Sequence, residues 1–218
     1  MNNARCLLFD LDGTLTDNYE GISRCVIHAL QAMGCALPDE VVLRGCVGPP
    51  LRHSFARLLS TDDGERIESA ISHYRDRYSA YGWRENAVYP GIADALEELA
   101  AGGNRLFVCT SKPQLYAERI VAHLGLAPHL HGVHGPDLEG RLDDKRDLMA
   151  ALLAAEQISP VRCVMIGDRT QDMVAARANK VAGLGVLWGY GTREELLSAG
   201  AQALATRPED LPAKLTAF

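Results

Sequence analysis

Short apolar runs alternate with amphipathic segments along most of this 218-residue chain. The apolar runs have the length of strands and occur at Cys6–Phe9, Leu106–Cys109, Cys163–Ile166 and Gly183–Leu187. Apolar positions at helical spacing predict intervening helices at Ile92–Ala101, Gln114–His123, Lys145–Glu156 and Gln171–Ala178. Strands that are apolar throughout and separated by helices are typical of a parallel sheet covered on both faces. The pattern therefore predicts an α/β protein with a Rossmann-like core of three layers.

The region between residues 17 and 85 interrupts this alternation. Apolar residues recur there at helical spacing, and no strong strand lies between them. They are Ile22, Val26, Ala29, Leu30 and Met33, followed by Ile67, Ala70, Ile71, Tyr74 and Tyr78. We expect a small helical cap domain at residues 17–85, inserted into a core formed by residues 1–16 and 86–218. A unit joined to a core at two nearby points can act as a lid that excludes water.

Composition narrows the class of partner. The formal net charge is −6 and no basic run occurs, which argues against binding to a nucleic-acid polymer. No apolar run approaches the roughly 20 residues of a membrane-spanning helix, and the first residues lack the pattern of a signal peptide. We therefore expect a cytoplasmic protein without a membrane partner, acting on a small molecule as a monomer or homodimer.

The cysteines indicate a reducing compartment. None of the six forms a CxxC pair or has the spacing of a zinc finger, and several lie in apolar surroundings. They are Cys6, Cys25, Cys35, Cys46, Cys109 and Cys163. Free cysteines in apolar segments behave as small buried apolar residues, so this spacing fits reduced thiols better than a disulfide framework.

The first strand leads directly into the segment Phe9-Asp10-Leu11-Asp12-Gly13-Thr14-Leu15. Asp10 and Asp12 are two residues apart on extended backbone and point the same way, so their charges repel unless a cation joins them. In open α/β sheets, ligands bind at the carboxyl ends of strands. The segment therefore indicates chemistry on an anionic group with a metal ion present, although Asp and Gly are also common in ordinary turns.

Three later segments place polar groups at comparable points. Thr110, Ser111 and Lys112 follow the second strand, Lys145 begins a helix, and the segment Gly167–Asp172 follows the third strand. Together with Asp10–Thr14, and in this order, they resemble the motifs of the haloacid dehalogenase superfamily. The resemblance covers nearly the whole chain and points to the phosphoglycolate phosphatase-like branch, which carries a small helical cap after the first strand.

This resemblance implies a Mg²⁺-dependent phosphatase acting on a small phosphorylated metabolite of the phosphoglycolate or 5′-nucleotide class. Asp10 would be the nucleophile that forms an aspartyl phosphate, and Asp12 would protonate the leaving oxygen and then activate water. Asp10, Asp168 and the main-chain carbonyl of Asp12 would hold Mg²⁺, while Asp172 orients its ligands. Taken alone, Asp168 and Asp172 also fit a pair of acids at a helix N-terminus.

The resemblance also assigns the phosphate-binding groups. The Thr110 hydroxyl and the Ser111 amide would bind phosphate oxygens, and Lys145 would balance the charge of Asp10 and the phosphoryl group. Lys145 is not followed by the proline that is common in this family, which makes Lys112 a second candidate. By themselves, Thr110 also fits a helix cap and Lys145 a surface lysine in a helical ion pair.

On the predicted cap, the turn Arg44–Arg52 resembles the Gly-Pro-Pro segment of related caps. We expect Arg44, Gly48 and Arg52 to take part in substrate binding, with either arginine meeting a second anionic group. An arginine on a loop between helices is equally often solvent-exposed.

Three histidines, His129, His131 and His134, lie close together in the sequence. On extended backbone His129 and His131 share a face and His134 does not. A zinc site needs three or four converging ligands. We therefore expect a loop or an edge strand rather than a metal site.

Two other functions use the same residues. A phosphomutase of the β-phosphoglucomutase type would use Asp10 and Asp12 but return the phosphoryl group to a sugar. A non-catalytic sensor of a phosphorylated ligand would use the same fold. Dehalogenation fits less well, because that chemistry does not use the second aspartate.

The segments Asp144–Ala151 and Gly167–Arg169 favour a nucleotidase-like subgroup among the phosphatases.

Overall fold

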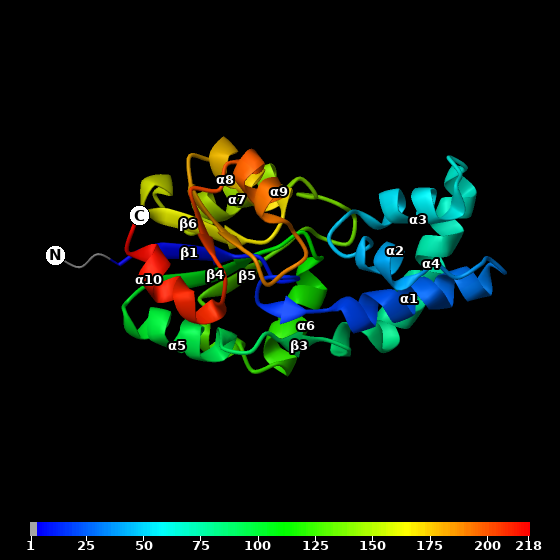
Figure 1. Cartoon of the computed structure of the whole chain (residues 1–218), viewed down its shortest axis with the longest axis horizontal. Coiled ribbons are helices and arrows are strands. Elements are labelled where there is room, and N and C mark those ends of the chain that lie inside the picture. Colours follow the sequence, from blue (N-terminus) through cyan, green and yellow to red (C-terminus); the bar gives the residue numbers. More distant parts are fainter. Residues whose placement is uncertain (1–3) are drawn as a thin grey trace. The chain divides into compact units, whose positions relative to one another are not determined.

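The computed structural model describes residues 4–218, and the chain divides into two compact units. The core unit contains the chain up to residue 17 together with residues 88–218, and the helical unit contains residues 18–87 (Figure 1). A separate two-stranded sheet, β2 (Thr16–Asp17) with β3 (Ala87–Val88), is formed by the residues at which the chain passes from one unit to the other.

The core unit is built on a six-stranded sheet with the strand order β5-β4-β1-β6-β7-β8. All neighbouring strands in it are parallel. The strands are β1 (Cys6–Phe9), β4 (Arg105–Cys109), β5 (Gly132–His134), β6 (Cys163–Gly167), β7 (Ala182–Val186) and β8 (Ala203–Ala205). Because β1 pairs with both β4 and β6, the residues that follow these three strands meet at the same edge of the sheet.

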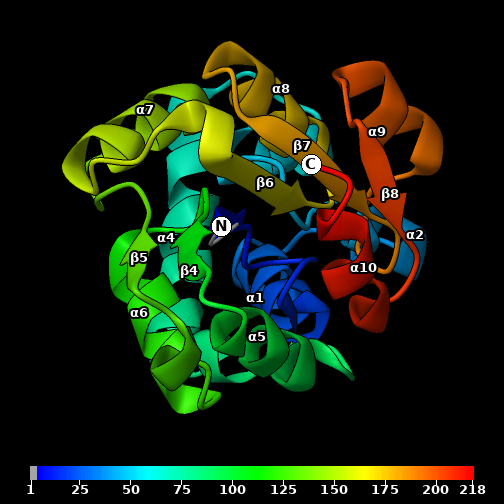
Figure 2. The same ribbon diagram turned by 90° about the vertical axis from the view of Figure 1, so that its left-hand side faces the viewer.

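Helices cover both faces of this sheet. They are α5 (Ile92–Ala101), α6 (Gln114–His123), α7 (Lys145–Ala155), α8 (Thr170–Ala178), α9 (Arg193–Ala199) and α10 (Leu211–Leu215). α7, α8 and α9 form one layer, α5 and α10 lie on the opposite face, and α6 lies beside β5 (Figure 2). This arrangement confirms the predicted α/β class with three layers. Within residues 4–218, no helix has the length and apolar character needed to span a bilayer.

Alternate residues of the central strands face opposite helical layers. Leu8 of β1 and Phe107 of β4 belong to the same buried cluster as Leu152 of α7. Their neighbours on β1, Leu7 and Phe9, are also fully buried. Burial on both faces explains why these strands are apolar throughout instead of alternating with polar residues.

Sequence periodicity locates the central elements to within one residue. β7, for example, covers Ala182–Val186 where the pattern predicts Gly183–Leu187. The outer elements β8, α9 and α10 are not predicted by the pattern, whereas β5 lies where a loop or an edge strand is expected. Strands of three residues, such as β5 and β8, are too short for a periodic signal.

The helical unit has an aromatic core. It contains α1 (Tyr19–Ala32), α2 (Glu40–Arg44), α3 (Leu51–Leu59), α4 (Gly64–Ala80) and the 3₁₀ helix η1 (Gly82–Arg84). Phe55 of α3 is fully buried, and its ring meets Tyr74 of α4 edge-on at a centroid distance of 6.2 Å. Tyr74 in turn stacks on Tyr78 at 5.6 Å. Offset and edge-on ring pairs of this kind add to the stability gained from burial.

We predict that Phe55→Ala lowers the free energy of unfolding of the helical unit by about 3–5 kcal/mol, because it leaves a cavity beside Tyr74. Val41→Ala, at a position that is 79% exposed, should change it by less than about 0.5 kcal/mol. Urea unfolding followed by Trp83 fluorescence measures both changes if Trp188, the other tryptophan, is replaced by Phe in every variant. Equal effects of the two substitutions would contradict this packing.

Candidate active site

Buried polar side chains gather at the carboxyl edge of the core sheet. Asp10 follows β1, Thr110 follows β4 and Asp168 follows β6. Lys145 is the first residue of α7, and Asp172 lies in the first turn of α8. Each of these five residues is at most 6% exposed. Burial of so many ionisable groups requires that they compensate one another.

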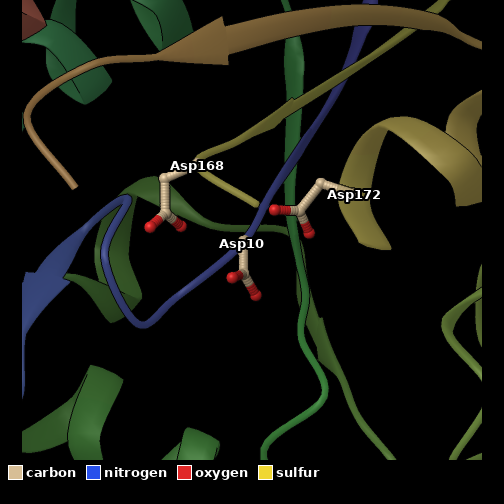
Figure 3. A group of neighbouring side chains, drawn as sticks. All are labelled: Asp10, Asp168 and Asp172. Atoms are coloured by element: carbon tan, nitrogen blue, oxygen red, sulfur yellow. The ribbon is translucent and has the colours of Figure 1, made fainter. Parts of the chain in front are cut away.

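Asp10, Asp168 and Asp172 form one carboxylate cluster (Figure 3). A carboxylate oxygen of each lies within 4.8 Å of those of the other two. Across residues 4–218, this is the only group of three or more His, Cys, Asp or Glu side chains with a spacing that suits a shared metal ion. Carboxylate oxygens are the ligands that hard divalent cations such as Mg²⁺ prefer.

Lys145 supplies a positive charge to this cluster. Its Nζ lies 2.8 Å from Oδ1 of Asp10 and also forms an ion pair with Asp172. Burial by itself lowers the pKa of Lys145, but the attraction of Asp10 and Asp172 outweighs this and raises the pKa above its usual range. The ammonium group is therefore charged at neutral pH and contacts two of the three carboxyl groups.

Two carboxyl groups of the cluster, those of Asp168 and Asp172, hold protons more tightly than usual. Burial raises the pKa of Asp168 to about 8, and the nearby charges of Asp172 and Asp10 add to this effect. Burial also raises the pKa of Asp172 to about 6, against the attraction of Lys145. Near neutral pH the cluster thus retains a proton that a bound cation would displace.

The loop after β1 is attached to Asp168. The Thr14 hydroxyl donates to Oδ1 of Asp168 at 3.2 Å, and the main-chain N–H of Tyr190 donates to Oδ2 at 2.8 Å. The indole Nε1 of Trp188 donates to the Thr14 carbonyl at 2.9 Å. Gly13 has φ +85°, and a Cβ there would lie 2.3 Å from Oδ2 of Asp168. Only glycine fits at this position.

Asp12 contacts a different lysine. Its Oδ2 lies 2.8 Å from Nζ of Lys112, and its side chain is 17% exposed. Its Oδ1 is buried and has no hydrogen-bond partner among the residues that the structure describes. Burial raises the pKa of Asp12, against the attraction of Lys112. The two lysines that the sequence offered for one role thus have separate partners: Lys145 contacts Asp10, and Lys112 contacts Asp12.

The residues after β4 follow the strand that pairs with β1. The N–H of Thr110 donates to the His134 carbonyl at 3.0 Å, and its hydroxyl accepts a hydrogen bond from the N–H of Lys112 at 3.2 Å. Ser111 is exposed in the bend before α6, which begins at Gln114. The role of Thr110 and Ser111 in binding phosphate stays a prediction.

The residues expected to select the substrate belong to the helical unit. Arg44 ends α2, with its guanidinium 4.5 Å from the ring centroid of Tyr19 and paired with Glu40. Arg52 is near the start of α3 and pairs with Glu68. Both arginine side chains are more than half exposed. Gly48 has φ +98° in the turn between these helices. Their part in binding also stays a prediction.

The three histidines have separate surroundings. His129 ends the 3₁₀ helix η2 (Ala127–His129), and His134 lies in the edge strand β5. Nε2 of His134 is 3.6 Å from Oε1 of Glu156. Nδ1 of His131 accepts a hydrogen bond from the N–H of Leu106 at 3.2 Å. In the described part of the chain they belong to no metal-binding group.

Sequence reasoning did not identify Thr14, Trp188 and Tyr190 as parts of the site. Thr14 belongs to the first motif, but its bond to Asp168 depends on how the loop folds back. Trp188 and Tyr190 belong to the segment Trp188-Gly189-Tyr190-Gly191, which follows the predicted fourth strand. The position of this segment at the carboxyl edge of the sheet was the one sequence signal that it belongs to the site. The residue type of Tyr190 gave no signal, because its contact with Asp168 is made by a main-chain N–H that almost any residue supplies.

Comparison with known proteins agrees with this geometry. A family model described as haloacid dehalogenase-like hydrolase matches residues 7–186. A 5′-nucleotidase from Pseudomonas aeruginosa is 41% identical over 190 residues, which are 87% of this chain and 86% of that protein. A phosphoglycolate phosphatase from Colwellia psychrerythraea is 30% identical over 212 residues, which are 93% and 92% of the two chains.

Another relative carries a different name. The tyrosine-protein kinase PtkA from Mycobacterium tuberculosis is 40% identical over 189 residues, which are 87% of this chain but 64% of the kinase. Among solved structures, a predicted phosphatase from Clostridium acetobutylicum superposes with a TM-score of 0.91 at 36% identity, covering 99% of this chain and all of the other. The family match and these relatives confirm the resemblance of the four motifs: the chain belongs to the haloacid dehalogenase-like hydrolase family.

Proposed function

We propose that this protein is a Mg²⁺-dependent phosphatase that hydrolyses a small phosphomonoester through an aspartyl phosphate on Asp10. The observation that carries the proposal is the buried contact between Asp10 and Lys145 inside the carboxylate cluster. A carboxylate at the end of a central strand, beside a fixed ammonium group, is suited to attack an anionic centre. The family membership and the phosphatase-named relatives support the same activity.

The cluster fits Mg²⁺. The cluster holds three carboxyl groups, and the one ammonium group beside it contacts two of them, so two negative charges stay uncompensated when all three are ionised. Asp10 and Asp168 would hold the ion, Asp172 would orient its ligands through the contact with Lys145, and the main-chain carbonyl of Asp12 would complete the set. Bound there, Mg²⁺ would neutralise charge on the phosphoryl oxygens.

The chain's own residues supply the remaining chemistry. An oxygen of Asp10 forms a bond to phosphorus while the bond to the leaving oxygen breaks, and Asp12 gives that oxygen its proton. Asp12 then takes a proton from water as the water oxygen attacks phosphorus, which releases phosphate and restores the carboxylate of Asp10. The raised pKa of Asp12 suits an acid that must carry a proton near neutral pH. Lys145 and the Thr110 hydroxyl stabilise the phosphoryl oxygens.

Among substrates, 5′-nucleotides are favoured over phosphoglycolate. The nucleotidase-named relative is 41% identical and the phosphoglycolate phosphatase-named one 30%. We assign the recognition of the rest of the substrate to Arg44, Gly48 and Arg52 of the helical unit, since two exposed guanidinium groups beside a turn can bind a second anionic group.

A second candidate function is transfer of the phosphoryl group to an acceptor other than water. The aspartyl phosphate is the same, and the similarity to a tyrosine-protein kinase over 87% of this chain makes an acceptor hydroxyl a specific alternative. A phosphomutase would use a sugar hydroxyl in this way. A non-catalytic sensor is disfavoured, because every position that the reaction needs carries a reactive side chain.

Phosphate release from a panel of 5′-nucleotides, phosphoglycolate, sugar phosphates and pyrophosphate, with Mg²⁺ or EDTA, tests the proposal. We expect turnover of one substrate class that needs Mg²⁺ and falls at least about a thousandfold in Asp10→Asn, because the nucleophile is lost. Asp94→Asn, which changes an exposed acid in the first turn of α5, should keep full activity.

Full activity in Asp10→Asn would rule out the assigned nucleophile. Consumption of substrate without release of phosphate, accompanied by a phosphorylated acceptor, would favour the transferase instead. Adding a sugar monophosphate or a tyrosine-containing peptide to the same assay distinguishes the acceptors.

Mg²⁺ should stabilise the protein more at about pH 8 than at about pH 6. The folded-state pKa of Asp168, about 8, lies above the unfolded value, so the metal-free fold binds an extra proton and loses stability as pH rises toward 8. A cation must displace this proton, and it therefore binds more tightly at the higher pH. The increase in Tm on adding Mg²⁺ at the two pH values measures the effect.

Asp168→Asn provides the control for this measurement. It removes both the titrating carboxyl group and a proposed ligand, so the metal-free Tm should depend less on pH and the response to Mg²⁺ should largely disappear. An equal increase in Tm with Mg²⁺ at both pH values in the unsubstituted protein would contradict the assignment of Asp168.

A further inference from the structure

The segment Trp188-Gly189-Tyr190-Gly191 after β7 contacts the site at several points. Trp188 donates to the Thr14 carbonyl at 2.9 Å, and the N–H of Tyr190 donates to Oδ2 of Asp168 at 2.8 Å. The phenol hydroxyl of Tyr190 donates to Oδ1 of Asp17 at 2.5 Å. One residue thus holds the carboxylate cluster through its main chain and Asp17 through its side chain.

The segment has little freedom to shift. A Cβ on Gly189 would lie 2.2 Å from the Gly13 carbonyl and 2.5 Å from Oδ2 of Asp168. The backbone of this segment is therefore packed directly on the loop after β1 and on the cluster. A side chain attached to such a backbone is a fixed point from which a hydrogen bond can restrain a neighbour.

Asp17 occupies a particular place in the chain. It is the last residue of the core unit before the helical unit begins, and Tyr89 is the second residue after the chain returns. The N–H of Tyr89 donates to the Leu15 carbonyl at 3.1 Å. Burial raises the pKa of the Tyr89 hydroxyl, as does the charge of Asp17, against a hydrogen bond with Tyr190. The Tyr190 phenol thus contacts Asp17, where the chain leaves the core unit, and Tyr89, where it returns.

We propose that Tyr190 is a positioning residue, whose hydroxyl fixes Asp17 and thereby the far end of the loop that carries Asp10 and Asp12. The near end of this loop is fixed by β1, so the bond to Tyr190 restrains the second end. At 2.5 Å it has the length of a charge-assisted hydrogen bond. The helical unit begins at the next residue, so the bond holds the point at which the chain leaves the core unit.

This inference rests on the proposed phosphatase reaction for its kinetic consequence. Tyr190→Phe removes the hydroxyl and keeps both the ring and the N–H that holds Asp168. We expect kcat to fall about three- to tenfold, the factor that a hydrogen bond of ordinary net strength supplies. KM and the Mg²⁺ concentration for half-maximal activity should change less than about twofold, because no group that binds them is removed.

Substitutions at Asp17 test the bond itself. Asp17→Asn keeps an acceptor oxygen and should retain most of kcat, whereas Asp17→Ala should match Tyr190→Phe. The double variant, Tyr190→Phe with Asp17→Ala, should be no slower than either single variant, because the two substitutions remove the same interaction. Tyr81→Phe, at a tyrosine that is 64% exposed, is the matched control and should leave kcat unchanged.

Amide hydrogen exchange separates this inference from the proposed function. In Tyr190→Phe, exchange should accelerate at residues 15–18 and 88–90 and stay unchanged in β1, whether or not a substrate has been found. Absence of phosphate release from the unsubstituted protein would overturn the phosphatase and leave this comparison valid. Unchanged exchange in Tyr190→Phe, or losses of kcat that multiply in the double variant, would overturn the role of Tyr190.

Discussion

Lys145 carries its charge where only 4% of its surface is exposed, and Asp10 and Asp172 on either side compensate for the lost hydration. Removing one partner of a buried ion pair leaves a charge without compensation and costs several kcal/mol, far more than the loss of an exposed pair. Asp10 directly follows β1, Lys145 begins α7 and Asp172 lies in the first turn of α8, so these contacts join the end of the central strand to two helices of one layer. These contacts of Lys145 set the positions of Asp10 and Asp172, on which the rest of the site depends.

The acids of the site are predictable from sequence because they follow recognisable strands. Asp10 and Asp168 come directly after apolar runs, and the parallel order of the strands brings those ends together. The assignment of the lysines was not predictable in this way. Lys112 and Lys145 both lie near strand or helix ends, and the packing of α7 against the sheet determines which of them reaches Asp10.

Other elements and residues could not be predicted from the sequence for different reasons. β8 is too short to produce a period, and Tyr190 acts on Asp168 through a main-chain group that sequence letters do not encode. The motifs also say more about the reacting centre than about the substrate. Relatives with this fold carry the names of a nucleotidase, a phosphoglycolate phosphatase and a kinase, because a shared core leaves the acceptor and the rest of the substrate to residues outside the motifs.

The strand order has a consequence for folding during synthesis on the ribosome. β1 emerges first, but its neighbours β4 and β6 begin about a hundred and about a hundred and sixty residues later, after the whole helical unit. Pairings between such distant segments form slowly, because a long loop must close first. β6 follows Lys145 in the chain, so the lysine has already been made when β1 acquires its second neighbouring strand, and Asp168 and Asp172 come directly after β6. Asp10 is therefore enclosed between two neighbouring strands only when Lys145 is available to compensate its charge.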